Sequence, residues 1–164
     1  MPSPHLSAYL NDHLAGAVAA LEMIAHLQSA HADILDPDTL GRVEEEVEAD
    51  RATLESLMER LGITQSRTRR AAGWLAERAS RLKLAVDDPK DGALRAFETI
   101  EIVSLGIEGK ISLWQSLAAA ASSDPVLSGV DYDALIARAR DQRRTVETLH
   151  ADAARTALVD RHGA

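Results

Sequence analysis

Residues 93–120 read ALRAFETIEIVSLGIEGKISLWQSLAAA, a long run without proline. Apolar side chains recur in it at helical intervals, as at Phe97, Ile100, Ile107 and Ile111. This spacing places them on one face of an α-helix, and such a helix must bury that face against other elements. The run therefore predicts a long amphipathic helix that belongs to a helical bundle.

Three further stretches have the same periodicity, at about residues 7–29, 37–62 and 132–159. The turn at residues 33–37 connects the first two, and residues 122–129, rich in Ser, Pro and Gly, connect the last two. Helices joined by such short connections pack as antiparallel neighbours. The sequence predicts two antiparallel hairpins within a single domain that covers residues 1–164.

The connection between the hairpins, from about residue 63 to residue 90, is too long for a turn. It contains a shorter predicted helix at about residues 67–82. Two hairpins joined by a long crossover are typical of four-helix bundles with one crossover connection. The alternative is a five-helix up-and-down array in which the short helix is a full member.

The composition excludes several classes of protein. The chain has no cysteine, so thiolate metal sites, disulfides and cysteine nucleophiles are excluded. The net charge of −8 disfavours nucleic acid, and the basic segment Arg67 to Lys83 is the only candidate surface for it. No signal peptide and no apolar run of membrane-spanning length occur, so we expect a cytoplasmic protein without a membrane partner.

Polar side chains on the apolar faces are the candidates for function, because buried charges need partners or a metal. The predicted metal ligands, one on each long helix, are His13, Asp50, Glu101 and His150. Two imidazoles and two carboxylates suit a single Fe, Mn or Zn ion. A second layer would contain Glu108 and Gln142.

Two other interpretations of these residues stay open. The buried polar groups can form a hydrogen-bonded network that fixes helix register without any metal. The chain would then be a non-catalytic interaction protein, either a homodimer or a partner-binding bundle. The third interpretation is a small organic ligand or an acid–base pair. Local enzyme signatures such as a Gly-rich phosphate loop or a nucleophile elbow do not occur, which favours a role other than catalysis.

Glycines inside predicted helices add a related question. Gly16, Gly106 and Gly109 each cost up to about 1 kcal/mol relative to alanine. They provide either room for a ligand beside Glu108 or a close approach between helices.

The two-hairpin plan and three short strings of the sequence resemble a set of uncharacterised bacterial ferritin-like proteins. The strings are His13-Leu14-Ala15-Gly16-Ala17, Ala49-Asp50-Arg51 and Gly106-Ile107-Glu108-Gly109-Lys110. The resemblance implies a ferritin-like four-helix bundle, with Asp50, Glu101 and His150 as candidate ligands. The di-iron motif of ferritin-like proteins is not intact, because the second helix has no His and Glu147 of the Glu-x-x-His string points away from the core.

Overall fold

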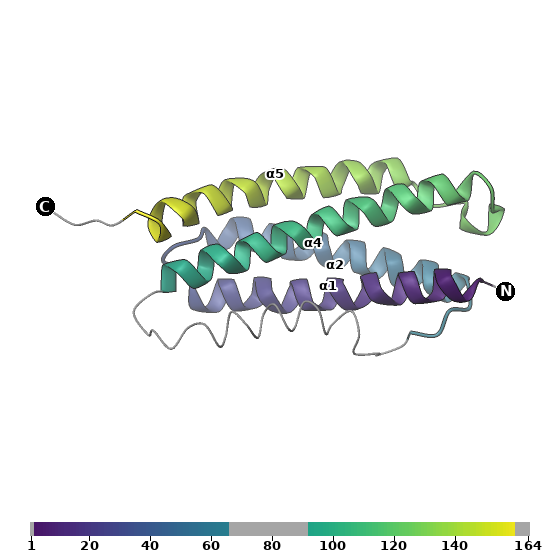
Figure 1. The fold of residues 1–164 in the computed structure, drawn as a ribbon, viewed down its shortest axis with the longest axis horizontal. Helices are drawn as coiled ribbons and strands as arrows, with labels where there is room; N and C mark the ends of the chain where they lie inside the picture. Colours follow the sequence, from purple (N-terminus) through teal and green to yellow (C-terminus); the bar gives the residue numbers. More distant parts are fainter. Residues whose placement is uncertain (1, 66–91, 160–164) are drawn as a thin grey trace, which may run out of the picture.

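The computed structural model describes residues 2–65 and 92–159, which contain α-helices and no strand. The helices are α1 (Pro4–Ala30), α2 (Pro37–Arg60), α4 (Gly92–Ala121) and α5 (Tyr132–Ala157), and the short 3-10 helix η1 (Pro125–Leu127) follows α4. The four long helices lie lengthwise beside one another (Figure 1). The predicted all-α bundle is thereby confirmed. No helix in the described ranges has the length and apolar character to cross a membrane.

Side-chain caps set where three of the helices begin. Ser3, Asp36 and Asp131 each accept a hydrogen bond from a backbone N–H in the first turn of α1, α2 and α5, respectively. Proline follows directly after two of these caps, at Pro4 and Pro37, where its fixed φ fits the first helical position. Because of the Ser3 cap, α1 begins about one turn earlier than its apolar periodicity predicts.

The helices bury two separate apolar clusters. α1 packs against α2 and α4, and α5 packs against α4 and α2. One cluster lies toward the C-terminal end of α1 and includes Ile24, Val43, Val47, Ile100 and Val146. The other lies toward the N-terminal end of α1 and includes Leu10, Leu57, Met58, Trp114 and Leu135. The middle of the bundle, between these clusters, contains charged and polar side chains.

The predicted helix at residues 67–82 lies outside the described residues. The same holds for the basic segment Arg67 to Lys83.

The connection between α4 and α5 yields a test of local stability. The buried Tyr132 hydroxyl donates a hydrogen bond of 2.7 Å to the Leu127 carbonyl oxygen. Tyr132→Phe removes this donor and leaves the carbonyl without its partner, so we expect a loss of about 0.5–1.5 kcal/mol in the free energy of unfolding. Urea denaturation measures the change. Tyr9→Phe is the matched control, because no hydrogen bond joins the Tyr9 hydroxyl to the described residues; an equal loss in both variants would contradict the assignment.

Candidate functional site

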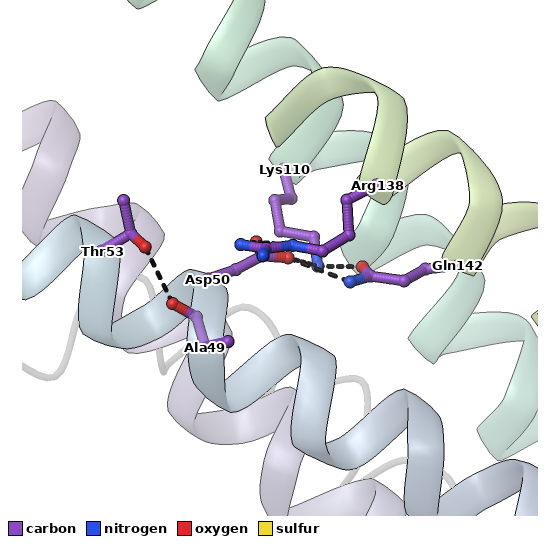
Figure 2. A network of polar contacts seen from close by, with 6 residues as sticks. All are labelled: Ala49, Asp50, Thr53, Lys110, Arg138 and Gln142. Atoms are coloured by element: carbon purple, nitrogen blue, oxygen red, sulfur yellow. Dashed lines mark hydrogen bonds and ion pairs between the residues drawn. The ribbon is translucent and has the colours of Figure 1, made fainter. Parts of the chain in front are cut away.

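Asp50 of α2 is a buried carboxylate at the centre of the bundle, with 2% of its surface exposed. Its Oδ2 accepts hydrogen bonds from Lys110 Nζ at 2.6 Å and from Gln142 Nε2 at 3.1 Å. Its Oδ1 accepts from Arg138 Nε at 2.8 Å and from the Nη2 atom of the same guanidinium. Figure 2 shows these side chains of α4 and α5 converging on Asp50. Four donors occupy the roughly four lone-pair positions of the carboxylate, so it is fully satisfied.

The sequence brings these four residues to one level through ordinary helical spacing. Asp50 lies one turn after Val47 and one turn before Leu54, which belong to different apolar clusters. Lys110 lies between Ile107 and Trp114 in the same way. Arg138 and Gln142 are one turn apart on α5, so both reach the same carboxylate. The Asp50 network, defined as Asp50, Lys110, Arg138 and Gln142, therefore forms a polar layer between the two apolar clusters.

Lys110 is the unusual member of the Asp50 network. Its side chain is 13% exposed and bonds both Asp50 and the Gln142 Oε1 atom. Burial lowers the pKa of Lys110 below its ordinary value, and this effect exceeds the opposite effect of the Asp50 charge. The nearby Arg138 lowers the pKa further, whereas Glu46 on α2 raises it. The interior thus disfavours the charged amine even though a carboxylate lies beside it.

A partly enclosed cavity of about 290 Å³ borders the network between α1, α2 and α4. We call it the central cavity. Its walls are mainly apolar, with side chains such as Val47, Leu54, Val103 and Leu113. Asp50 and Lys110 lie on the wall as well, together with Asp12, His13 and Arg51, so charged groups border a mainly apolar space.

Small residues make room for the central cavity. Along α1 no residue is buried between Leu14 and Ile24, and the cavity wall there is formed by residues that include Gly16, Ala17 and Ala20. On α4 the wall includes Gly106 and Gly109, and a Cβ atom added to either would meet no described atom within 4 Å. Close helix approach is therefore not what these two glycines provide.

His13 lies on the wall of the central cavity, half-buried, with its ring edge-on to Tyr9 at 4.6 Å between centroids. Burial lowers the pKa of His13 by more than the neighbouring Asp12 raises it. His13 and Asp50, two of the predicted metal ligands, are not hydrogen-bonded to each other, because the hydrogen bonds that Asp50 accepts within the described residues come from α4 and α5. His13 and Asp50 share a cavity without being partners.

The expected burial of Glu101 is wrong, since this residue is exposed. The buried face of α4 is centred on Ile100, Val103, Ile107 and Trp114, and Glu101 projects about 100° away from Ile100. Glu108 is exposed too and forms an ion pair with Arg143 of α5. The predicted inward position of Glu108 is therefore also wrong.

His150 is half-buried on α5 and stacks on Phe97, with 4.7 Å between the ring centroids. It lies eight residues beyond Gln142, or about 12 Å along the helix, so it does not reach the level of Asp50. Within residues 2–65 and 92–159, no three His, Asp or Glu side chains are grouped closely enough to hold a metal ion. The metal site thus stays a prediction, and of its four predicted ligands His13 and Asp50 line one cavity.

The inward positions of Asp50 and Gln142 are confirmed, whereas Lys110 and Arg138 were not predicted. A signal for Lys110 exists in the sequence. Lys110 continues the alternating four-and-three spacing of the buried residues Ala96, Ile100, Val103 and Ile107, and Trp114 and Leu117 extend it. A lysine within such a stripe indicates a buried charge that needs a carboxylate partner.

No protein-family model, curated protein or solved structure matches this chain. The resemblance to ferritin-like proteins therefore stays a prediction, and the function is to be inferred from the Asp50 network and the central cavity.

The network predicts a large effect of removing its carboxylate. Asp50→Ala leaves the Lys110 amine buried without its counter-charge, and we expect a loss of about 3–5 kcal/mol in the free energy of unfolding. Denaturant unfolding at neutral pH measures it.

Replacing the buried pair together, by Asp50→Leu with Lys110→Met, is expected to recover most of that loss, because it leaves no charge stranded between the clusters. Arg138, which is 36% exposed, can then turn toward water. A loss below about 1 kcal/mol in Asp50→Ala would contradict a buried, fully bonded carboxylate.

Proposed function

We propose that this chain is a helical bundle that binds a small, mainly apolar molecule in the central cavity. The observation that carries the proposal is the convergence of Gly16, Gly106 and Gly109, from two helices, on one cavity. Each glycine costs about 0.5–1 kcal/mol relative to alanine inside a helix. At Gly106 and Gly109 no packing contact offsets this cost, since added Cβ atoms would meet open space. A ligand that occupies the space supplies the missing contacts.

The size and lining of the cavity support a small ligand. A cavity of about 150 Å³ accommodates benzene. The central cavity, at about 290 Å³, has room for a molecule of roughly a dozen non-hydrogen atoms. Apolar walls with a few polar groups are typical of ligand sites, where the polar groups fix the orientation of the ligand.

We also propose that the helices have the ferritin-like arrangement of two antiparallel hairpins joined by a crossover. Two observations support it. Only residues 31–36 separate the packed helices α1 and α2, and the chain colours of Figure 1 progress in opposite directions along these two helices. The same holds for α4 and α5, which are joined through η1.

Toluene is a suitable probe of the central cavity, since it is apolar and smaller than the available space. We expect saturable binding of toluene to the wild type, followed through the emission of Trp114 on the cavity wall in a Trp74→Phe background. Gly106→Leu places a side chain in the cavity and should abolish this binding.

The control for that test is Gly41→Ala, which changes a helical glycine of α2 outside the cavity. A Cβ atom there meets Gln28 Nε2 at an ordinary 3.8 Å. Gly41→Ala and Gly106→Ala should each raise the free energy of unfolding by about 0.5–1 kcal/mol, while Gly41→Ala leaves toluene binding unchanged. A wild type that shows no saturable toluene binding would refute the proposed function.

A single Fe, Mn or Zn ion held by His13 and Asp50 is the second candidate. It is favoured by one observation, the position of both side chains on the wall of the same cavity. An ion would have to displace one of the four donors that now occupy Asp50.

Melting of chelator-free protein with and without EDTA tests the metal. A resident ion stabilises only the folded state, so EDTA should lower the melting midpoint of the wild type and leave His13→Ala unaffected. A midpoint that ignores both EDTA and added Fe, Mn or Zn would end the metal proposal.

A further inference from the structure

We propose that Lys110 binds a small apolar aldehyde or ketone in the central cavity as an imine, also called a Schiff base. This inference rests on the proposed function, since it names the chemical class of the ligand that the cavity takes. It goes further because it assigns a covalent step to one side chain.

Lys110 is positioned where a ligand in the central cavity would contact it. Lys110 lies on the wall of the central cavity between α4 and its neighbours, and it supplies the one primary amine among the described lining residues. Gly106 and Gly109, one turn before and directly before it, leave open space on the same helix. A ligand in the cavity therefore lies against the Lys110 side chain.

The hydrogen bonds of the Lys110 nitrogen leave one of its directions without a partner among the described residues. Nζ is tetrahedral, and the Cε atom, Asp50 Oδ2 and Gln142 Oε1 account for three of its four directions. A neutral amine retains two N–H groups, enough to keep both hydrogen bonds, and its lone pair takes the fourth direction. No partner from the described residues occupies that direction, so the network holds the amine in place and leaves its lone pair available.

The network also tolerates the loss of the lysine charge. Arg138 donates two hydrogen bonds to Asp50 Oδ1, so the buried carboxylate keeps a cationic partner when Lys110 is neutral. Glu46 of α2 also acts on Lys110, and the cavity wall carries Asp12 and His13 of α1 and Arg51 of α2. Burial disfavours the ammonium form, which supports the same conclusion.

The chemical step balances without an oxidant or a reductant. The nitrogen lone pair forms a bond to the carbonyl carbon, and the carbonyl π electrons move to the oxygen, giving a carbinolamine after one proton passes from nitrogen to that oxygen. Asp50 Oδ2, at 2.6 Å from Nζ, is placed to relay the proton. Loss of the hydroxyl with the second nitrogen proton releases one water and leaves the C=N bond. Amine and carbonyl compound thus yield imine and water.

Two properties of the cavity favour this step for an apolar carbonyl compound. Binding next to Nζ makes the encounter effectively intramolecular, which raises the local concentration of the carbonyl group. The apolar walls reduce the access of water, which reverses imine formation. The walls also select against large or highly charged carbonyl compounds.

Benzaldehyde with sodium cyanoborohydride tests the proposal on the full chain at neutral pH. The hydride reduces the imine to a stable secondary amine, and peptide mass mapping locates the label. Besides the N-terminal amine, the chain contains only Lys83, Lys90 and Lys110. We expect Lys110 to be labelled about tenfold faster than the other two lysines, or faster still. Equal or slower labelling of Lys110 would overturn the inference.

Competition between toluene and benzaldehyde tests the proposal on the wild type, so the test does not depend on whether a variant folds. Toluene has nearly the shape of benzaldehyde and no carbonyl group, so saturating toluene should slow labelling of Lys110 and leave Lys83 and Lys90 unchanged. Lys110→Arg keeps a cation beside Asp50 and should lose the fast label. Gly41→Ala should retain it, and Gly106→Leu should lose it.

The outcomes separate this inference from the proposed function. Saturable toluene binding without preferential labelling of Lys110 would overturn the imine and leave the cavity as a ligand site. Absence of toluene binding together with absence of preferential labelling would overturn both. Fast labelling of Lys110 that toluene does not slow would overturn the inference as well, because the amine would then react outside the cavity.

Discussion

The buried carboxylate of Asp50 is the constraint on which the arrangement of the bundle depends. A charge in the interior is tolerated only with nearly all its hydrogen-bonding capacity satisfied. Asp50 meets this condition through donors on two other helices, so α2, α4 and α5 must be aligned along their axes until Lys110, Arg138 and Gln142 are level with it. Apolar contacts alone permit a shift by one turn, whereas this network does not.

α1 contributes to the bundle differently, and the central cavity follows from that difference. Its buried residues lie toward its two ends, at Leu10 and Leu14 in one apolar cluster and at Ile24 and Leu27 in the other. Between them, at the level of the Asp50 network, α1 presents small side chains such as Ala17. The Asp50 network thus has the hydrogen-bond donors of α4 and α5 on one side and the central cavity on the other. The candidate site lies where the donors and the cavity meet.

The sequence was sufficient for the helices and insufficient for their mutual placement. Apolar periodicity predicted all four long helices in the described residues, and the inward positions of Asp50 and Gln142, because each depends on one helix alone. On α4 the periodicity was ambiguous, since Leu105 is apolar yet 47% exposed. The predicted buried face of α4 was centred slightly away from the true one. It therefore included Glu101 and Glu108 and excluded Lys110. The packing of the helices decides which residues of different helices lie at the same level. The apolar periodicity of one helix carries no information about that packing.

A lysine in this core is costly for the stability of the fold. A buried ion pair seldom stabilises a fold more than apolar residues of equal volume would, and the interior lowers the pKa of Lys110 despite the adjacent carboxylate. The glycines beside it add a further cost to the stability of α4. Register alone requires neither an open space nor a primary amine, since an arginine or an amide can also bond Asp50. A cavity with an amine held in its wall by two hydrogen bonds is what the covalent binding of a carbonyl ligand requires.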